Sequence, residues 1–350
     1  MKNTIFIRVD SGRDVGYGHI IRCLALAENL KNFFKIVFLT TNSKENLNSI
    51  IRKNKYNLIQ LKKTSKTLPN VKSKFDADQI IKIINKIGNK KSLLLVDNYN
   101  LSYKWESMIK PFVNKVIVID DLITRKHNCD LIIDQNLHTN MKKLYVDSIP
   151  KNCIKLFGPN YVILRKQFLQ EKKYVKKRKL PIKKILITFG GSDNQNYTLS
   201  VLNNLKILDI KKMAFVVVGK ANSNKKSIKS FCKKFPNFEY IEQTDNMAKL
   251  IRKSDLSIGS GGTTTWERCF LGLPSIIIVT SNDQKDIANA ISKKKCAINI
   301  GEIKKSSMIN LNYIIQNFKS KDFENMSKKC MNLVDGKGVI RITNEIRKLS

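Results

Sequence analysis

Short, strongly apolar runs alternate with helical patterns along this chain of 350 residues. Several of the runs are almost unbroken stretches of Ile, Leu and Val, as at 92–96, 116–119 and 276–279. A strand that is apolar on both of its faces belongs in a parallel sheet that helices cover on both sides. The alternation therefore predicts an α/β fold with parallel sheets.

The expected strands form two series separated by a basic run. They lie at 4–10, 35–41, 57–61, 92–98, 115–121 and 131–134, and then at 184–189, 214–219, 238–241, 256–259 and 275–280. The clearest helical patterns between them cover 20–33, 78–87, 195–208 and 264–271, and the tail from 303 to 350 predicts two or three amphipathic helices.

The two series predict two Rossmann-like domains that face each other across a cleft. We place them at 1–165 and 182–335, joined by a helix and linker at 166–181 and followed by a C-terminal helix at 336–350. The linker carries the basic run 172–179, whose charge we interpret as a solvated face rather than a binding site.

The formal net charge is +37, from 65 Lys and Arg against 28 Asp and Glu. Lys far outnumbers Arg and is scattered, whereas proteins that hold phosphate backbones rely on Arg as well. We therefore disfavour a nucleic-acid partner, although the field attracts anionic substrates. A non-enzymatic anion or nucleic-acid binder is one alternative, and steep loss of binding with salt would indicate it.

The seven cysteines are an odd number, widely spaced and without a C-x-x-C pair. They predict buried free thiols in a reducing cytoplasm, and together with the three histidines they show no zinc spacing. No signal-peptide pattern and no membrane-spanning apolar run is evident. We expect a cytoplasmic monomer without cofactor or structural metal.

Glycine is scarce, with 15 residues, and eight of them fall in three clusters just past expected strands and ahead of helices: Gly12/Gly16/Gly18, Gly190/Gly191 and Gly259/Gly261/Gly262. Ligands of open α/β sheets bind outside the carboxyl ends of the strands. A glycine turn there lets backbone N–H groups approach a phosphate.

His19 follows the first glycine cluster at the start of a helix. An imidazole at a strand-end loop can serve as a general base, and we favour that role over helix capping or packing. The pattern G-x-G-x-x-G is broken at Ile21, so the cluster does not support an NAD enzyme.

The third cluster continues into Thr263, Thr264, Thr265 and Glu267. Gly261 and Gly262 can bring backbone donors to a diphosphate. The threonines offer hydroxyls and a helix cap, and Glu267 can accept bonds from a ribose diol. An ordinary N-cap with a Glu complementing the helix dipole is the alternative.

Acidic residues end two of the expected strands, as Asp97-Asn98 and Asp120-Asp121. A metal site of the D-x-D type needs separated carboxylates, whereas adjacent ones on a strand point apart. Hydrogen bonding or lining of a site is favoured over metal ligation for both.

Several strings together resemble the UDP-sugar hydrolases of pseudaminic acid biosynthesis (the PseG family), relatives of the GT-B glycosyltransferases of the MurG type. The strings begin at Arg8–Asp10 and run through Val15–Cys23, Asp120–Leu122 with His127, Cys129-Asp130 and Asn136, Gly158–Arg165, Phe189–Asp193 and Gly261–Pro274. The resemblance implies a GT-B fold, with His19 as catalytic base. It further implies uridine and diphosphate contacts from Gly191, Gly261, Gly262 and Glu267.

The same resemblance extends the expected site. UDP contacts are completed by Gly190, Ser192, Thr263 and Thr264, and sugar contacts are expected from Asp10, Gly16, Tyr17, Gly18, Arg22, Tyr99, Asn136, Tyr161 and Gln284. The chain departs from the family pattern at Gly12, Asn98, Asp134, Thr263 and 282–284, several of which would lie near the sugar.

The implied reaction is hydrolysis of UDP-2,4-diacetamido-2,4,6-trideoxy-β-L-altropyranose to the free sugar and UDP. His19 would deprotonate water for an inverting attack on C1, with no metal. Its main alternative is a GT-B glycosyltransferase that uses a UDP-sugar donor for a surface or spore-coat polysaccharide, with an acceptor hydroxyl in place of water.

Overall fold

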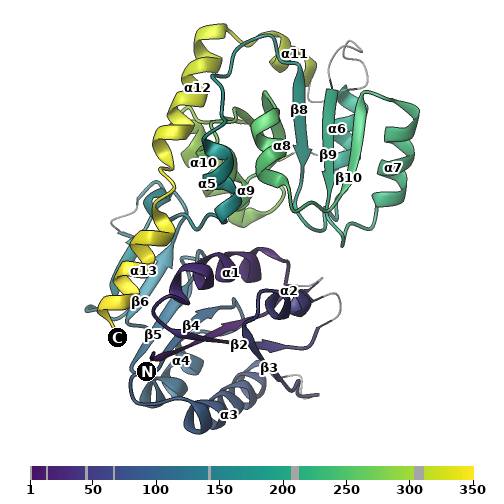
Figure 1. Ribbon diagram of the computed structural model, residues 1–350. Coiled ribbons are helices and arrows are strands. Elements are labelled where there is room, and N and C mark those ends of the chain that lie inside the picture. The colour runs from purple at the N-terminus through teal and green to yellow at the C-terminus, as the bar shows by residue number, and fades with distance from the viewer. Residues whose placement is uncertain are drawn as a thin grey trace. The chain divides into compact units, whose positions relative to one another are not determined.

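The computed structural model describes residues 2–12, 15–43, 46–65, 68–140, 143–205, 213–302 and 311–350 (Figure 1). They form two compact units. The first comprises Met1–Asn136, Asn140–Arg165 and Lys337–Ser350, and the second comprises Leu137–Thr139 and Lys166–Gly336.

The first unit holds a parallel sheet with the strand order β3-β2-β1-β4-β5-β6-β7. Its strands are β1 (Thr4–Val9), β2 (Lys35–Thr41), β3 (Asn57–Leu61), β4 (Leu93–Asp97), β5 (Lys115–Ile119), β6 (Leu131–Asp134) and β7 (Ile154–Phe157). The helices around it are α1 (Gly18–Leu30), α2 (Asn48–Lys53), α3 (Pro69–Ile87), α4 (Tyr103–Ile109) and α13 (Gly338–Lys348).

Alternate side chains of β1 enter two different cores, as a strand covered on both faces requires. Ile5 and Ile7 pack with apolar residues of α1 and α13, whereas Phe6 packs with residues of α3 and α4. The continuous apolar runs of the sequence are explained by this double coverage.

The second unit repeats the plan with a parallel sheet of order β10-β9-β8-β11-β12-β13. Its strands are β8 (Lys184–Thr188), β9 (Met213–Val218), β10 (Phe238–Glu242), β11 (Leu256–Ser260), β12 (Ser275–Ile278) and β13 (Ile298–Asn299). Its helices are α5 (Lys166–Lys172), α6 (Tyr197–Leu205), α7 (Lys225–Lys234), α8 (Met247–Lys253), α9 (Thr264–Phe270), α10 (Lys285–Lys293), α11 (Leu311–Gln316) and α12 (Ser320–Leu333).

The predicted α/β class with two parallel sheets is confirmed, and each expected strand is present. The strands β7 and β13 were not expected, because each is short and lies at the edge of its sheet, where the apolar pattern is weak. The helix expected at 78–87 begins at Pro69, in a polar segment with little periodicity. Residues 206–208 of another expected helix, and 303–310 of the tail, lie outside the described residues.

The tail forms the amphipathic helices α11, α12 and α13, as predicted. Val339, Ile342 and Ile346 of α13 are buried in the core of the first unit, beside Ile20 of α1. The last segment of the chain thus returns to the N-terminal unit (Figure 1).

The interpretation of the basic run 172–179 as a solvated face is wrong for two of its side chains. Arg178 is buried and donates hydrogen bonds to the carbonyl groups of Ile251, Arg252 and Ser254, at the C-terminal end of α8. Lys172 Nζ donates to the carbonyl of Phe270 at 2.5 Å. Both cations lie against the partial negative charge of a helix C-terminus, a tertiary contact that composition does not reveal.

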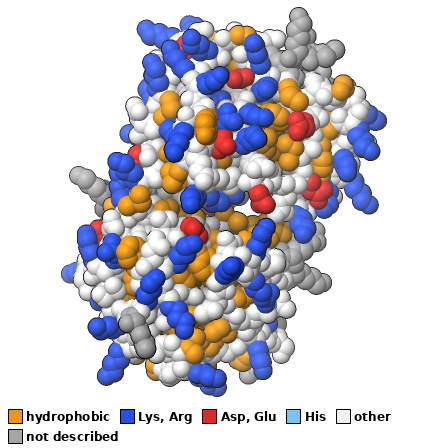
Figure 2. Space-filling model, in the orientation of Figure 1, with side chains coloured by type: hydrophobic (Ala, Val, Ile, Leu, Met, Phe, Trp, Pro, Cys, Tyr) orange, Lys and Arg blue, Asp and Glu red, His pale blue; other side chains and the backbone are white. Residues whose placement is uncertain are grey.

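Basic side chains elsewhere are spread over the visible face, as the scattered Lys pattern suggested (Figure 2). All seven cysteines are free and buried, as predicted. Among the helices of the described ranges, none is long and apolar enough to cross a membrane. The cytoplasmic location and the monomeric state stay predictions.

Candidate active site

The candidate site of the first unit lies at the carboxyl ends of β1, β4 and β5, which are neighbours in the sheet. The chain connects β1 to β2 on one side, whereas β4 lies on its other side. At such a reversal of strand order the connecting loops diverge, and α/β proteins bind ligands there. The first glycine cluster follows β1, and the two predicted acidic spots follow β4 and β5.

The loop after β1 is closed by backbone hydrogen bonds between Gly12 and Gly16, with Gly16 N donating to Gly12 O at 2.8 Å. Gly16 has φ +83°, a conformation that other residues adopt only with strain. Gly18 begins α1, and His19 is therefore delivered to the strand ends by the first turn of that helix.

His19 is oriented by a buried carboxylate. Its Nδ1 lies 2.7 Å from Oδ1 of Asp97, the last residue of β4. Arg22, one turn further along α1, donates to both oxygens of Asp97 through Nε and Nη2, each at 2.6 Å. Burial acts to raise the pKa of Asp97, but the charge of Arg22 and the hydrogen bonds from Arg22 and His19 outweigh it and hold that pKa well below its usual range.

The ionised Asp97 fixes the tautomer of His19. A carboxylate can only accept hydrogen bonds, so the 2.7 Å contact favours the tautomer in which Nδ1 of His19 carries the proton and Nε2 has the lone pair, although Arg22 Nη2 also lies 3.1 Å from Nδ1. No partner is recorded for Nε2 in the part of the chain that the structure describes. The imidazole is thus arranged to accept a proton at Nε2.

Tyr99 and Asp121 continue the site beside the imidazole. The ring of Tyr99 meets that of His19 edge-on, with centroids 4.6 Å apart, and its hydroxyl donates to Asp121. Arg22 Nη1 and Asn136 Nδ2 each donate to Asp121 Oδ2 at 3.3 Å. Burial and Asp121 together raise the pKa of Tyr99, which keeps the phenol protonated as a donor.

The adjacent carboxylates Asp120 and Asp121 point to different partners, as their positions after a strand suggested. Asp120 is fully buried and binds Arg125 Nε at 3.0 Å and His127 Nε2 at 2.6 Å. His127 Nδ1 lies 2.7 Å from Oε1 of Glu106 on α4. The carboxylates of Asp120 and Glu106 are therefore both hydrogen-bonded to basic side chains of the protein.

His127 was noted only as part of a family string, and the structure gives it two carboxylate neighbours. Burial by itself would lower its pKa, but the hydrogen bonds to Asp120 and Glu106 outweigh this and raise the pKa to about 9. His127 is consequently an imidazolium near neutral pH.

Two residues expected to contact the sugar are already engaged with the protein. Asp10 pairs with Arg8 at 2.7 Å and accepts from Thr41 and Asn98, and Arg22 is bound to Asp97 and Asp121. Both residues are at least nine-tenths buried. This geometry favours roles in positioning the loops over direct contact with a substrate.

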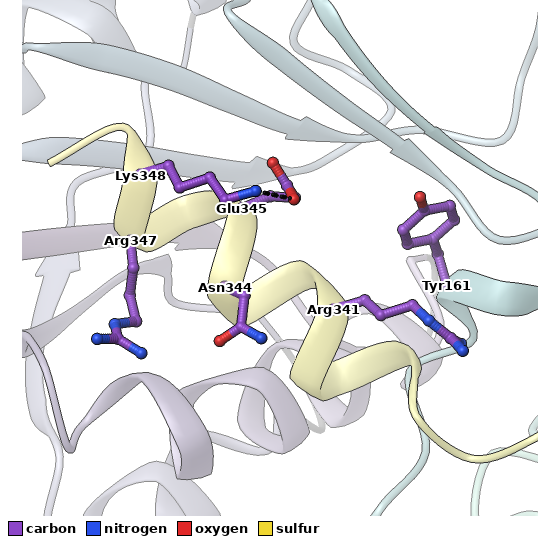
Figure 3. A pocket seen from close by; sticks show the side chains of 6 residues that line it. All are labelled: Tyr161, Arg341, Asn344, Glu345, Arg347 and Lys348. Atoms are coloured by element: carbon purple, nitrogen blue, oxygen red, sulfur yellow. Dashed lines mark hydrogen bonds and ion pairs between the residues drawn. The ribbon is translucent and has the colours of Figure 1, made fainter.

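Tyr161 lines a different pocket of the first unit, of about 650 Å³ (Figure 3). Its other walls come from α13, whose side chains there are Arg341, Asn344, Glu345, Arg347 and Lys348. The structure records no contact between Tyr161 and His19 among the described residues. The predicted sugar contacts of Gly16, Tyr17, Gly18, Tyr161 and Gln284 stay predictions.

The second unit presents its two glycine loops at the carboxyl ends of β8 and β11, which are neighbours in the sheet. After β8, Gly190 has φ +81°, and Asp193 accepts hydrogen bonds from Tyr197 N and Thr198 N of α6. After β11, Gly261 N donates to Gln284 Oε1 at 2.9 Å, and a Cβ added to Gly262 would meet open space. The loop therefore leaves room above Gly262.

Thr263 occupies the N-cap position of α9, but its side chain makes no capping hydrogen bond, so the expected threonine cap is wrong. The hydroxyl of Thr265 instead accepts from Arg268 Nη2 at 2.8 Å. Arg268, buried beneath this loop, was missed in the sequence. Its only sequence signal is a charged residue within the otherwise apolar end of the helix.

Comparison with known proteins agrees with the observed fold. Residues 185–338 match the glycosyltransferase family 28 C-terminal domain. Over its full length the fold is similar to that of MurG from Acinetobacter baumannii, with a TM-score of 0.68, 13% identity, and coverage of 99% of this chain and 100% of that chain. The protein thus has a GT-B fold, as the resemblance implied.

Three curated relatives are each 27% identical to the chain. The UDP-2,4-diacetamido-2,4,6-trideoxy-beta-L-altropyranose hydrolase of Campylobacter jejuni matches over 83% of this chain and 96% of its own length. The spore coat polysaccharide biosynthesis protein SpsG of Bacillus subtilis matches over 98% and 97%. An uncharacterized protein of Methanocaldococcus jannaschii matches 87% of this chain, which spans only 61% of that relative.

The resemblance to the pseudaminic acid hydrolase family is thereby confirmed, and the chain is similar to enzymes of nucleotide-sugar chemistry.

Proposed function

We propose that this protein hydrolyses a UDP-linked 2,4-diacetamido-2,4,6-trideoxy sugar, UDP-2,4-diacetamido-2,4,6-trideoxy-β-L-altropyranose, to the free sugar and UDP in pseudaminic acid biosynthesis. The observation that carries the proposal is the buried array Arg22–Asp97–His19, which leaves Nε2 of His19 as a proton acceptor at a strand-end site. The Campylobacter jejuni relative supports the choice of substrate.

In the proposed reaction, Nε2 of His19 takes a proton from a water molecule while the water oxygen forms a bond to C1 of the sugar. The C1–O bond to UDP breaks on the opposite face, and UDP leaves with the bonding electron pair. The attack inverts C1. Asp97 stabilises the imidazolium that forms, as the carboxylate of a His–Asp pair does in other enzymes.

One base is sufficient in this scheme. Inverting glycosidases need a carboxylic acid to protonate the leaving oxygen. UDP leaves as an anion that is already stable in water, so the scheme requires neither this second acid nor a metal ion. Tyr99 packs against His19 and donates a hydrogen bond to Asp121, so in this scheme it would lie beside the sugar.

The second unit would bind UDP. Backbone donors at Gly190, Gly191 and Gly262 suit a diphosphate, and Gly261 N would exchange its partner Gln284 for a phosphate oxygen. Ser192, Thr263 and Thr264 would supply hydroxyls, and Glu267 would accept from the ribose. The match of this unit to a glycosyltransferase C-terminal domain supports that assignment.

A glycosyltransferase is the second candidate, and the similarity to the spore coat polysaccharide biosynthesis protein favours it. The same base would then deprotonate an acceptor hydroxyl. The two reactions differ in whether UDP is released when no acceptor is present.

The test is incubation with a panel of UDP-sugars in ¹⁸O-labelled water, with UDP release and anomeric configuration followed by NMR and the label by mass spectrometry. Hydrolysis with inversion places ¹⁸O on C1 of the free sugar and none on UDP. Label on UDP would show cleavage at phosphorus and contradict the mechanism. UDP release only after an acceptor is added would replace the hydrolase with the transferase.

A further inference from the structure

Arg268 is a buried arginine beneath the Gly261-Gly262 loop. It follows Glu267 on α9, is 1% exposed, and is among the largest fully buried side chains of the described residues. Arginine is almost never buried to this extent unless it is paired.

The guanidinium of Arg268 bonds both ends of the loop. Nη2 donates to the carbonyl of Ser260 at 2.7 Å and to Thr265 Oγ1 at 2.8 Å. These two residues bracket Gly261–Thr264, so the path of the intervening backbone depends on the guanidinium. Nη1 reaches Ser257 Oγ at 3.4 Å, and Nε has no hydrogen-bond partner among the residues that the structure describes.

The charge of Arg268 has no carboxylate at ion-pair distance in the described ranges, a feature that it shares with Arg178 but not with Arg22, although the charge of the neighbouring Glu267 acts on it. Arg22 pairs with Asp97 and Asp121, and Arg178 lies on the carbonyl groups that end α8. Burial lowers the pKa of Arg268 to about 10, so the group still carries its charge at neutral pH. A buried cation without a counter-charge is costly, and an anion bound nearby would offset that cost.

The guanidinium of Arg268 lies close to the strand ends that precede both glycine loops. A Cβ placed on Gly259 would lie 3.2 Å from Arg268 Nη1 and 2.1 Å from the carbonyl of Thr188. Thr188 ends β8, just ahead of Gly190 and Gly191. The charge therefore sits under the carboxyl ends of two adjacent strands, where α/β proteins bind ligands.

We propose that Arg268 is a positioning residue for a nucleoside diphosphate: its guanidinium fixes the Ser260–Thr265 loop, and its buried charge gives the loop a preference for ligands with more phosphate charge. This inference rests on the proposed UDP site and adds a residue to it. The ligand does not need to touch Arg268, because the field of a buried charge acts through the loop in a medium of low dielectric.

The test is calorimetric titration of the wild-type protein, Arg268→Gln and Arg268→Lys with uridine, UMP, UDP and inorganic pyrophosphate. Arg268→Gln removes the charge but keeps an amide donor, and we expect it to weaken UDP about tenfold or more, UMP less, and uridine less than twofold. Arg268→Lys keeps the charge but loses the guanidinium that donates to both Ser260 and Thr265. Most of the preference for UDP over uridine should therefore remain. Arg252→Gln, which breaks an ion pair with Glu171 in the same unit, is the matched control and leaves all affinities unchanged.

The outcomes separate this inference from the proposed function. Equal weakening of uridine, UMP and UDP in a folded Arg268→Gln protein means that Arg268 only shapes the loop, and overturns its electrostatic role while the UDP site stands. If pyrophosphate binding depends on Arg268 but no UDP-sugar is hydrolysed, the role proposed for Arg268 is supported and the proposed reaction is overturned. A wild-type protein that binds neither UDP nor pyrophosphate overturns both.

Discussion

Among single residues, His19 has its ring nitrogens and its exposure set by neighbours that are distant in sequence. Asp97 lies 78 positions away and fixes which imidazole nitrogen is free. Arg22 keeps Asp97 ionised, and Tyr99 covers one side of the ring. A histidine after two glycines does not by itself indicate a catalytic role. The buried Arg22–Asp97 ion pair that contacts its imidazole is the kind of environment found at functional sites.

Replacing His19 with Asn should lower kcat by about 10²–10⁴, the usual contribution of a general base. The amide roughly keeps the size of the imidazole but cannot accept a proton usefully. Because UDP would bind on the second unit, its Kd should change by less than about threefold, or ~0.7 kcal/mol. Steady-state rates and calorimetry measure the two effects, and strong loss of UDP affinity with an intact kcat would make His19 a phosphate ligand instead.

Replacing Asp97 with Asn keeps the shape of the side chain but removes the charge that orients His19. The amide can donate to Nδ1, which allows the wrong tautomer, and kcat should fall by about 10²–10⁴ with UDP affinity unchanged. Thermal unfolding is needed beside the kinetics, because Arg22 also loses its partner. A variant of normal rate would show that Asp97 only balances the charge of Arg22.

Replacing Glu267 with Ala should raise the Kd for UDP by about ten- to hundredfold, the ~1.4–3 kcal/mol expected when a charged hydrogen bond to the ribose is lost. Glu242→Ala is the matched control, since Glu242 is exposed on β10 of the same unit and pairs with Lys225. Calorimetry with UDP and with 2′,3′-dideoxy-UDP measures the difference. If Glu267→Ala binds UDP normally, the ribose assignment is wrong.

At the scale of the element, the segment after β5 is fixed to α4 by a buried charge network. His127 bridges Asp120 and Glu106, and Arg125 donates to Asp120 and to the carbonyl groups of Tyr99 and Leu101. These contacts position the loop after β4, which carries Tyr99. The ends of two neighbouring strands are thereby held in one arrangement beside His19.

His127 should make stability depend on pH. Its pKa is raised from 6.5 to about 9 in the folded protein, so the folded state binds the proton more tightly than the unfolded state. The stabilisation, about 3 kcal/mol, is fully present below pH 6.5 and is lost as the pH rises through about 9. Urea unfolding of the wild-type protein and of His127→Gln between pH 6 and 10 measures this.

The variant should be less stable at pH 6, by about 3–5 kcal/mol, because Glu106 and Asp120 lose their shared partner. Its stability should also change less than that of the wild type between pH 6.5 and 9. An equal difference between the two proteins at every pH would indicate lost packing rather than a lost imidazolium.

At the scale of the whole molecule, the C-terminal helix α13 completes the core of the N-terminal unit. Ile342 is fully buried there, whereas its near neighbour Ile340 on the same helix is 54% exposed. The two ends of the chain are therefore coupled in one folding unit, although a whole second unit separates them in the sequence.

Ile342→Ala should destabilise the first unit by about 2–5 kcal/mol, the cost of a large-to-small change in a packed core. Ile340→Ala makes the same chemical change on the exposed face and should stay within about 0.5 kcal/mol of the wild type. Chemical unfolding followed by Trp105 fluorescence in a Trp266→Phe background reports on this unit, since Trp105 is buried in its other core and Trp266 belongs to the second unit. Similar losses for the two variants would mean that α13 contributes helix propensity rather than packing.

The pattern of residues along the chain was enough to predict the class of fold and the glycine loops at the strand ends. Unbroken apolar runs such as β4 and β12 require cover on both faces, and glycine is needed where Gly16 and Gly190 adopt positive φ. Both are local requirements, which a pattern of neighbouring residues records. The resemblance of the strings around His19 and Gly261 then indicated the chemistry.

The pattern does not show which polar side chains contact one another, because that depends on how the strands are ordered in the sheet. Asp97 and His127 stood in the sequence as residues beside strands, and Arg268 as one charge in a short helix. Their roles depend on partners 78, 21 and 8 positions away, respectively. The net effect of a charge is set by its burial and by the groups within a few ångströms, and strand order determines which groups those are.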